Sequence, residues 1–231
     1  MSLWDWGQTL LALLFPERCP FCDAISVGGG PCESCASPDH GESCARDLPE
    51  PGNVPCFSPF RYDGEIREAI LRFKFRGRRD YASWFGGKIA KELLRRDLSR
   101  NAVLTPVPIS AGRMRERGYN QSLLLARAAA RVLEIPCVEL LEKVSENQTQ
   151  HLLSLEERRK NVRHVYRVKN GKAMQKEIIL LDDIVTTGYT LAECAATLRE
   201  AGLHVRCCAA LASAADRDGQ AGQEDEKRGK L

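Results

Sequence analysis

Two adjacent acidic residues, Asp182 and Asp183, follow an apolar run in the C-terminal half of this 231-residue chain. The run, Ile178 to Leu181, starts with β-branched residues and predicts a buried strand that ends at the two acids. A turn rich in hydroxyl groups follows, and Thr190 is expected to N-cap the next helix. Backbone N–H groups and the positive end of a helix dipole converge at such a turn, which predicts an anion site.

The carboxylates beside this anion site cannot bind the same phosphate, because like charges repel. They suit sugar hydroxyls or a bridging Mg²⁺ instead. A phosphate next to a pentose indicates a ribose 5-phosphate site, in which Asp182 and Asp183 are the candidate catalytic and ribose-binding residues. The candidate phosphate-binding residues are Thr186, Thr187, Gly188, Tyr189 and Thr190. The alternative is an ordinary buried strand that runs into a helix with a polar cap.

The segment 178–190 resembles the thirteen-residue phosphoribosyl pyrophosphate (PRPP) motif of type I phosphoribosyltransferases, with four apolar residues, two acids and a TxGxT-like loop. The resemblance implies that Asp182 and Asp183 hold the ribose 2′- and 3′-hydroxyls, and that the loop holds the 5-phosphate. Tyr189 departs from the motif, because that loop position is usually small. A ring that points outward would fit.

A second group of candidate functional residues, four cysteines, lies near the N-terminus. Cys19 and Cys22 form one CxxC pair, and Cys32 and Cys35 form another nine residues later. Each CxxC turn can direct two thiolates at one ion, so two turns predict a closed, structural Zn²⁺ site. Free buried thiols and a redox pair are the alternatives, but neither explains the second CxxC. The separate cysteines at positions 44 and 56 and His40 are expected to be incidental.

The composition describes a globular protein, with 43% hydrophobic and 28% charged residues and a formal net charge of +3. No signal peptide or apolar run long enough to span a bilayer is recognisable. We therefore expect a cytoplasmic protein with reduced cysteines. We also expect a small zinc-binding subdomain over residues 1–59, an α/β domain over 60–214 and a disordered tail over 215–231.

The elements that position the acids alternate between strands and helices. Helices are predicted over 3–15, 64–75, around Ile89 to Leu94, over 123–133 and after the acids. Strands are predicted over 102–107, 136–140, 178–181 and 204–212. This alternation predicts a mostly parallel sheet flanked by helices, with the ligand at the carboxyl ends of the strands.

Two further segments are candidates for the same site. Ser110, Arg113 and Arg117 follow the strand at 102–107 in a loop, and their donors and positive charges suit pyrophosphate. The polar segment 143–163 resembles the flexible loop that closes over PRPP, although a surface helix around 156–160 is equally compatible with it.

A basic stretch over 67–79 interleaves arginines and Lys74 with Phe73 and Phe75. Basic residues among aromatics can bind a single-stranded nucleic acid. The alternative is a solvated helix face.

Taken together, the CxxC…CxxC pairs, the LRFKFRGRRD run, PVPIS…RGYNQ, TQHLLSLEERRKN and LLDDIVTTGYT resemble the ComF family of phosphoribosyltransferase-like proteins over about residues 10–212. This resemblance implies PRPP with Mg²⁺ as ligand, a zinc knuckle and a link to DNA uptake in naturally transformable bacteria. The phosphoribosyl acceptor and the oligomeric state have no readable motif. A non-catalytic PRPP sensor or nucleic-acid-binding module is the rival interpretation.

Overall fold

The computed structural model describes residues 16–26, 28–36, 43–144, 165–169 and 176–214. The elements in these ranges are η1 (Glu33–Cys35), β1 (Cys44–Asp47), β2 (Pro55–Ser58), β3 (Phe60–Arg61), α2 (Gly64–Phe75), α3 (Tyr81–Arg95), β4 (Ala102–Pro106), α4 (Ala111–Arg117), α5 (Gln121–Leu133), β5 (Leu141–Lys143), β6 (Tyr166–Val168), β7 (Glu177–Val185), α7 (Tyr189–Glu200) and β8 (Val205–Ser213).

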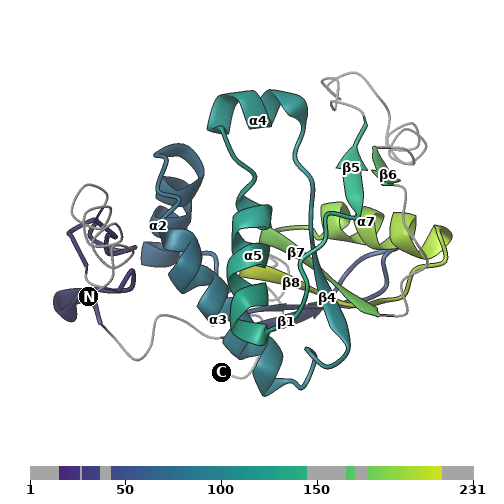
Figure 1. The fold of residues 1–231 in the computed structure, drawn as a ribbon, viewed down its shortest axis with the longest axis horizontal. Helices are drawn as coiled ribbons and strands as arrows, with labels where there is room; N and C mark the ends of the chain where they lie inside the picture. Colours follow the sequence, from purple (N-terminus) through teal and green to yellow (C-terminus); the bar gives the residue numbers. More distant parts are fainter. Residues whose placement is uncertain (1–15, 27, 37–42, 145–164, 170–175, 215–231) are drawn as a thin grey trace, which may run out of the picture.

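The described strands form a six-stranded sheet and a separate two-stranded hairpin of β5 and β6. The order in the larger sheet is β1-β2-β8-β7-β4, and β3 also pairs with β8 (Figure 1). Only the β1–β2 pair in this sheet is antiparallel, and the other pairs are parallel. The predicted α/β fold with a mostly parallel sheet flanked by helices is therefore confirmed.

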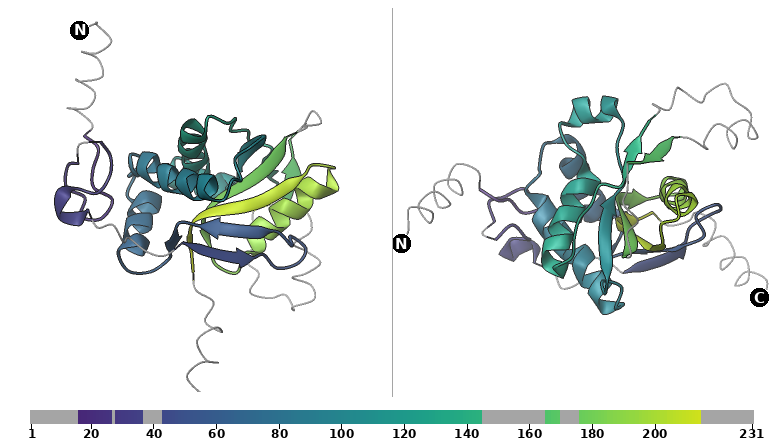
Figure 2. Two further views of the ribbon diagram at one scale, coloured as in Figure 1. Left: turned by 90° about the horizontal axis from the view of Figure 1, so that it is seen from below. Right: turned by 45° about the vertical axis from the view of Figure 1, so that its right-hand side comes forward.

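Helices cover both faces of the sheet, as Figures 1 and 2 show. Ile179 and Leu181 of β7 pack with residues of α2, α3 and α5, whereas Ile178 and Leu180 pack with α7. All four side chains are fully buried. Successive side chains of a strand point to opposite faces, so a continuous apolar run is the pattern of a strand covered on both sides.

Several predicted boundaries differ from the structure. The strand predicted over 136–140 is wrong: Cys137 forms an isolated bridge to Leu104, and the next strand begins at Leu141. β7 does not end at the two acids but continues to Val185, because β8 pairs with it as far as Ser213. The helix predicted over 123–133 begins at residue 121.

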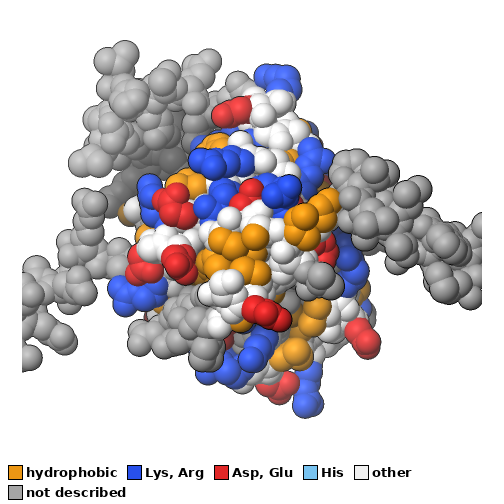
Figure 3. Space-filling model, turned by 90° about the vertical axis from the view of Figure 1, so that its left-hand side faces the viewer, with side chains coloured by type: hydrophobic (Ala, Val, Ile, Leu, Met, Phe, Trp, Pro, Cys, Tyr) orange, Lys and Arg blue, Asp and Glu red, His pale blue; other side chains and the backbone are white. Residues whose placement is uncertain are grey.

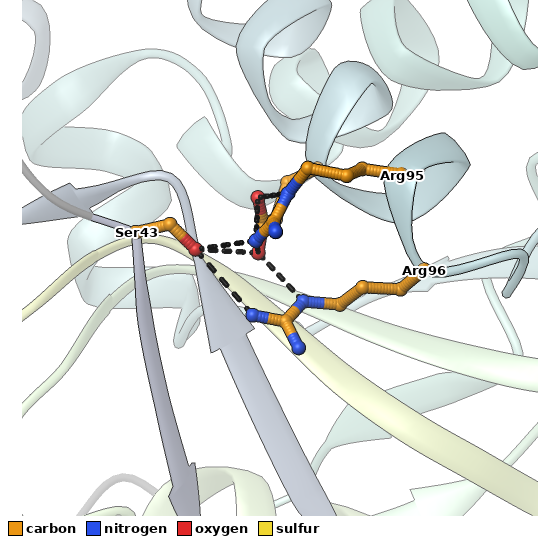
Figure 4. A network of polar contacts seen from close by, with 4 residues as sticks. Ser43, Arg95 and Arg96 are labelled. Carbon is orange, nitrogen blue, oxygen red and sulfur yellow. Dashed lines mark hydrogen bonds and ion pairs between the residues drawn. The ribbon is translucent and has the colours of Figure 1, made fainter.

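Two strands inside the predicted 1–59 segment, β1 and β2, extend the larger sheet. The start of β1 is tied to the end of α3 by a polar network, shown in Figure 4. Ser43 and Arg96 each approach the same Glu92 carboxylate oxygen to 2.7 Å, and Arg95 adds a third donor at 3.0 Å. Burial would raise the pKa of Glu92, but these hydrogen bonds outweigh it and hold the pKa below its usual range.

Some predictions fall outside the described residues. These are the helix over 3–15, His40, the greater part of the 143–163 loop and the tail over 215–231. The division of the chain into domains after residues 59 and 214 stays a prediction. Among the described helices, none combines the length and the apolar character that crossing a membrane requires.

Candidate functional site

The two acids of the motif lie next to each other on β7 but have different partners. The Ser122 hydroxyl, in the first turn of α5, donates a hydrogen bond of 2.8 Å to Oδ1 of Asp182. The same oxygen accepts the backbone N–H of Asp183, also at 2.8 Å. The Lys74 ammonium, in the last turn of α2, lies 3.0 Å from Oδ1 of Asp183. Each carboxylate is therefore held by a different helix.

The pKa of Asp182 is raised from 3.8 to about 6. Burial is the main cause, and the negative charge of Asp183 adds to it. Hydrogen bonds from Ser122 and from the Asp183 backbone, together with the charge of Lys74, act in the opposite direction. A carboxylate whose ionised form is this costly gains from every additional hydrogen-bond donor. Such a group suits a ligand that presents hydroxyl groups.

The loop after β7 turns sharply into α7 at Gly188. This residue has a φ of 81°, in the left-handed region, and occupies the N-cap position of α7. An added Cβ would lie 2.8 Å from Cδ2 of Leu48 and 3.0 Å from Cδ of Pro49. Both the backbone angle and the close approach therefore require glycine. Arg46 of β1 supports the loop by donating a hydrogen bond of 2.6 Å to the carbonyl of Thr186.

The prediction that Thr190 is the N-cap of the helix is wrong, because Gly188 occupies the N-cap position and Thr190 lies in the first turn of α7. Around this turn the side chains of Thr186, Thr187 and Thr190 are exposed. Tyr189 is 60% exposed, so its ring points outward and leaves the turn open. The hydroxyl groups of the loop are accessible beside the N-terminus of a twelve-residue helix.

The segment after β4 is a short helix, α4, rather than the predicted loop. Ser110 caps it, since its Oγ accepts the backbone N–H of Arg113 at 3.3 Å. Burial lowers the pKa of Lys143, and the positive charge of Arg113 contributes to the same shift. Burial also raises the pKa of Tyr166, with the charges of Arg113 and Asp182 acting on it in opposite directions. Arg113 and Asp182 therefore act on the same two neighbours, Lys143 and Tyr166.

Arg117 is engaged with α2 and α5. Its guanidinium lies over the Phe75 ring, 4.9 Å from the centroid, and donates a hydrogen bond of 3.3 Å to Oε1 of Gln121. Its role as a pyrophosphate ligand stays a prediction.

Sequence reasoning missed Ser122 as a partner of the acids and saw Lys74 only as part of a basic stretch. A signal for both was available, because Ser122 directly follows the RGYNQ run and Lys74 lies inside LRFKFRGRRD. Sequence reasoning also did not single out Glu193 of α7, because a polar residue on a helix gives no sign of its surroundings in the fold. Burial raises the pKa of Glu193 to about 7, and its Oε1 is buried without a hydrogen-bond partner.

The four cysteines of the two CxxC pairs converge. The Sγ atoms of Cys19, Cys22, Cys32 and Cys35 all lie within 4.8 Å of one another. The sulfurs of Cys22 and Cys32 are 3.5 Å apart. A tetrahedral site with Zn–S bonds of about 2.3 Å needs sulfur separations of about 3.8 Å. The four thiols could therefore hold one metal ion. In the described part of the chain, this group includes neither Cys44 nor Cys56.

The thiols of this group strongly affect one another. A hydrogen bond from Cys22 lowers the pKa of Cys32 to about 7, whereas burial and the neighbouring thiols raise the pKa of Cys35 to about 12. Four thiolates so close together would repel, and a divalent cation removes that repulsion as it binds.

We call residues 16–36 the knuckle. It is fixed to α2 by Arg72, which donates hydrogen bonds of 2.7 Å to the carbonyls of Pro20 and Phe21. The Phe21 ring also packs edge-on against Trp84 of α3, with 5.5 Å between the centroids. Figure 1 shows the knuckle beside α2, away from the β5–β6 hairpin.

The basic stretch over 67–79 has mostly structural partners. Arg78 pairs with Asp23 of the knuckle at 3.0 Å. The Arg79 guanidinium lies 4.6 Å from the Tyr119 ring centroid. On the face of the molecule seen in Figure 3, Lys and Arg side chains are interspersed with acidic and apolar ones. Of this stretch, Phe75 remains 56% exposed and offers an aromatic surface.

No family model matches the chain. It is similar to the competence protein ComFC of Bacillus subtilis, with 35% identity over 63% of this chain and 58% of that protein. Competence protein F of Haemophilus influenzae is 32% identical over 58% of this chain and 62% of its own length. Competence protein ComFC of Streptococcus pneumoniae is 28% identical over 80% of this chain and 82% of its own length. The chain thus spans about three fifths of the first two curated relatives.

The resemblance to the ComF family, which the sequence motifs carried, is confirmed by these relatives. Among solved structures, adenine phosphoribosyltransferase overlaps 82% of this chain and 90% of its own, with 11% identity and a TM-score of 0.39. Orotate phosphoribosyltransferase from Aeropyrum pernix overlaps 67% of this chain and 70% of its own, with 20% identity and a TM-score of 0.35.

Proposed function

We propose that the chain binds PRPP, or another ligand with a ribose 5-phosphate group, and transfers the phosphoribosyl group to an acceptor. The observation that carries this proposal is the acid pair on β7 followed directly by an open turn at the N-terminus of α7. In open α/β sheets, ligands bind outside the carboxyl ends of the strands. The acid pair and the turn both lie at that end of β7.

The ribose hydroxyls would donate to the carboxylates of Asp182 and Asp183. Asp182 gains most from such donors, because its ionised form is costly and is compensated only in part by Ser122, the Asp183 backbone and the charge of Lys74. The 5-phosphate would lie at the turn over 186–190, where hydroxyl groups are exposed and the helix dipole favours an anion.

In the transfer step, a nucleophile of the acceptor attacks C1 of the ribose, the C1–O bond to pyrophosphate breaks, and pyrophosphate leaves. The positive charge of Arg113 would stabilise the negative charge that develops on the leaving group. Mg²⁺ would supply further charge stabilisation. It would be held largely by the ligand's own oxygens, since Asp183 already faces the Lys74 ammonium.

We also propose that the knuckle holds one structural Zn²⁺ through Cys19, Cys22, Cys32 and Cys35. Four protein ligands leave no open coordination position, so the ion would stabilise the fold rather than take part in chemistry. Elemental analysis of the purified protein should find one zinc per chain.

A second candidate function is a non-catalytic module that binds single-stranded nucleic acid. The name of one relative supports a link to DNA: YhgH of Escherichia coli K12, 30% identical over 61% of this chain, is named a DNA utilization protein. In this chain the exposed Phe75 with the Arg117 guanidinium over its ring offers a stacking surface.

A ligand series separates these functions. If the ribose 5-phosphate site is correct, PRPP and ribose 5-phosphate should raise the melting temperature, and ribose or inorganic phosphate alone should raise it much less. Pyrophosphate release from PRPP would then be measured with a panel of bases, nucleotides and single-stranded DNA. Turnover with any acceptor supports the enzyme. Salt-sensitive DNA binding without turnover supports the module.

A further inference from the structure

The last turn of α2 brings a lysine to the acid pair. The Nζ of Lys74 is 3.0 Å from Oδ1 of Asp183, and the two side chains are only 15% and 13% exposed. Salt screens an ion pair so shielded from water much less than an exposed pair, and each charge would be costly without the other. The pair is therefore a shielded contact near the carboxyl end of β7 rather than a chance surface contact.

The RGYNQ run holds this turn in place. The Tyr119 hydroxyl donates to the carbonyl of Phe73, and Nε2 of Gln121 donates to the carbonyl of Lys74 at 3.4 Å. Carbonyls in the last turn of a helix have no partner within the helix. Two side chains of the run thus satisfy the end of α2. The guanidinium of Arg117 packs on the ring of Phe75 at the same end.

The run itself is anchored to the sheet and to α5. The Asn120 side-chain amide donates to the carbonyl of Val107, just after β4, at 3.0 Å. Its Oδ1 accepts the backbone N–H of Leu123 at 3.3 Å and so caps α5, the helix that carries Ser122. One short segment therefore fixes both partners of the acid pair, Ser122 through the start of α5 and Lys74 through the end of α2.

We infer that Lys74 is a positioning residue of the ribose site, acting through Asp183, and that the RGYNQ run serves to hold it there. This inference rests on the proposed ribose 5-phosphate site. Two adjacent carboxylates repel each other, and a cation fixed beside one of them allows both to remain ionised as hydrogen-bond acceptors. Lys74 thereby keeps the acid pair ready for two neighbouring hydroxyl groups.

A double-mutant cycle on the metal-loaded protein tests the inference. Binding of Mg²⁺·PRPP is measured for wild type, Lys74→Met, Asp183→Asn and the double variant. Lys74→Met should weaken binding about tenfold, within the range for contacting pairs. In the Asp183→Asn background the same change should have little further effect. Lys91→Met, an exposed lysine of α3, is the matched control and should bind like wild type.

Two results would overturn the inference. Unchanged binding by Lys74→Met would mean that the lysine does not position the site. An equal loss in both backgrounds would mean that Lys74 contacts the ligand itself rather than acting through Asp183. If Lys74→Met fails to fold, two other variants allow the PRPP affinities to be compared. The double variant leaves no unpaired carboxylate at position 183, and Lys74→Arg keeps the positive charge.

A second readout does not depend on PRPP. Carbon-13 NMR titration of the aspartate carboxyls should show the pKa of Asp182 rising in Lys74→Met, because the lysine charge lowers it in wild type. An unchanged Asp182 pKa would refute the electrostatic role of Lys74, whatever the ligand. If the pKa rises but wild type binds no PRPP, the electrostatic role stands and the proposed ligand is wrong.

Discussion

Replacing Asp182 by Asn should make the protein more stable near neutral pH while impairing its proposed site. The pKa of Asp182 is raised from 3.8 to about 6, which corresponds to about 3 kcal/mol against the ionised carboxyl in the folded chain. Asparagine has nearly the same shape, carries no charge and keeps an oxygen for the Ser122 hydroxyl and the Asp183 N–H. The substitution should therefore recover about 2–3 kcal/mol of unfolding free energy at pH 7.

The raised pKa of Asp182 also predicts how the stability difference between Asp182→Asn and wild type changes with pH. The folded pKa of Asp182 lies above the unfolded one, so the penalty is absent below about pH 4, where both states are protonated. It grows as the pH rises and is complete above about pH 6, where the folded carboxyl also ionises. Urea unfolding from pH 4 to pH 8 should give the free energy of unfolding of wild type and of Asp182→Asn at each pH. The two values should nearly coincide at the acid end and separate toward pH 7.

Two comparisons make this test specific. Asp97→Asn changes an exposed acid, which pairs with Arg100 at the surface, and should shift stability by less than about 1 kcal/mol. Asp183→Asn should be destabilising, because it leaves the shielded Lys74 ammonium without its partner, a loss of about 3 kcal/mol. The reasoning is refuted if Asp182→Asn is less stable than wild type at pH 7, or if its effect is the same at every pH.

Other perturbations test the parts that support the site. Arg72→Ala should speed proteolysis and hydrogen exchange of the knuckle, because it removes two charge-assisted hydrogen bonds; the exposed Arg67→Ala on the same helix should not, and equal rates would contradict the docking. Gly188→Ala should lower both stability and PRPP affinity, since its Cβ would approach Leu48 to 2.8 Å at a left-handed φ; a wild-type melting temperature would contradict this. Cys32→Ser should lose zinc by elemental analysis, and full retention would show that the ligand set is wrong.

Much of the fold could be predicted because its signals are local. The helix at 64–75 was predicted with the bounds that the structure has, since Ile66, Ile70 and Phe73 repeat at helical spacing and are buried. The continuous apolar run at 178–181 predicted the buried strand β7, which pairs with β8 on one side and β4 on the other. The convergence of the four thiols followed from the spacing of the CxxC pairs.

What could not be predicted depends on contacts between distant segments. The strand carrying Asp182 continues past the acids because β8 pairs with it, and no local pattern records that pairing. The partnership of Lys74 with Asp183 joins residues more than a hundred positions apart. The short helix α4 begins after a cap by Ser110. The prolines that precede Ser110 made this segment look like a loop.

The central claim is that the acid pair and the turn after it form a ribose 5-phosphate site. Titration calorimetry of the metal-loaded protein with Mg²⁺·PRPP tests it most directly. We predict one site per chain in wild type, and binding weakened by tenfold or more in the Asp182→Asn/Asp183→Asn variant at a pH where both proteins are folded. The absence of binding by wild type, or equal affinity of the double variant, would contradict the claim.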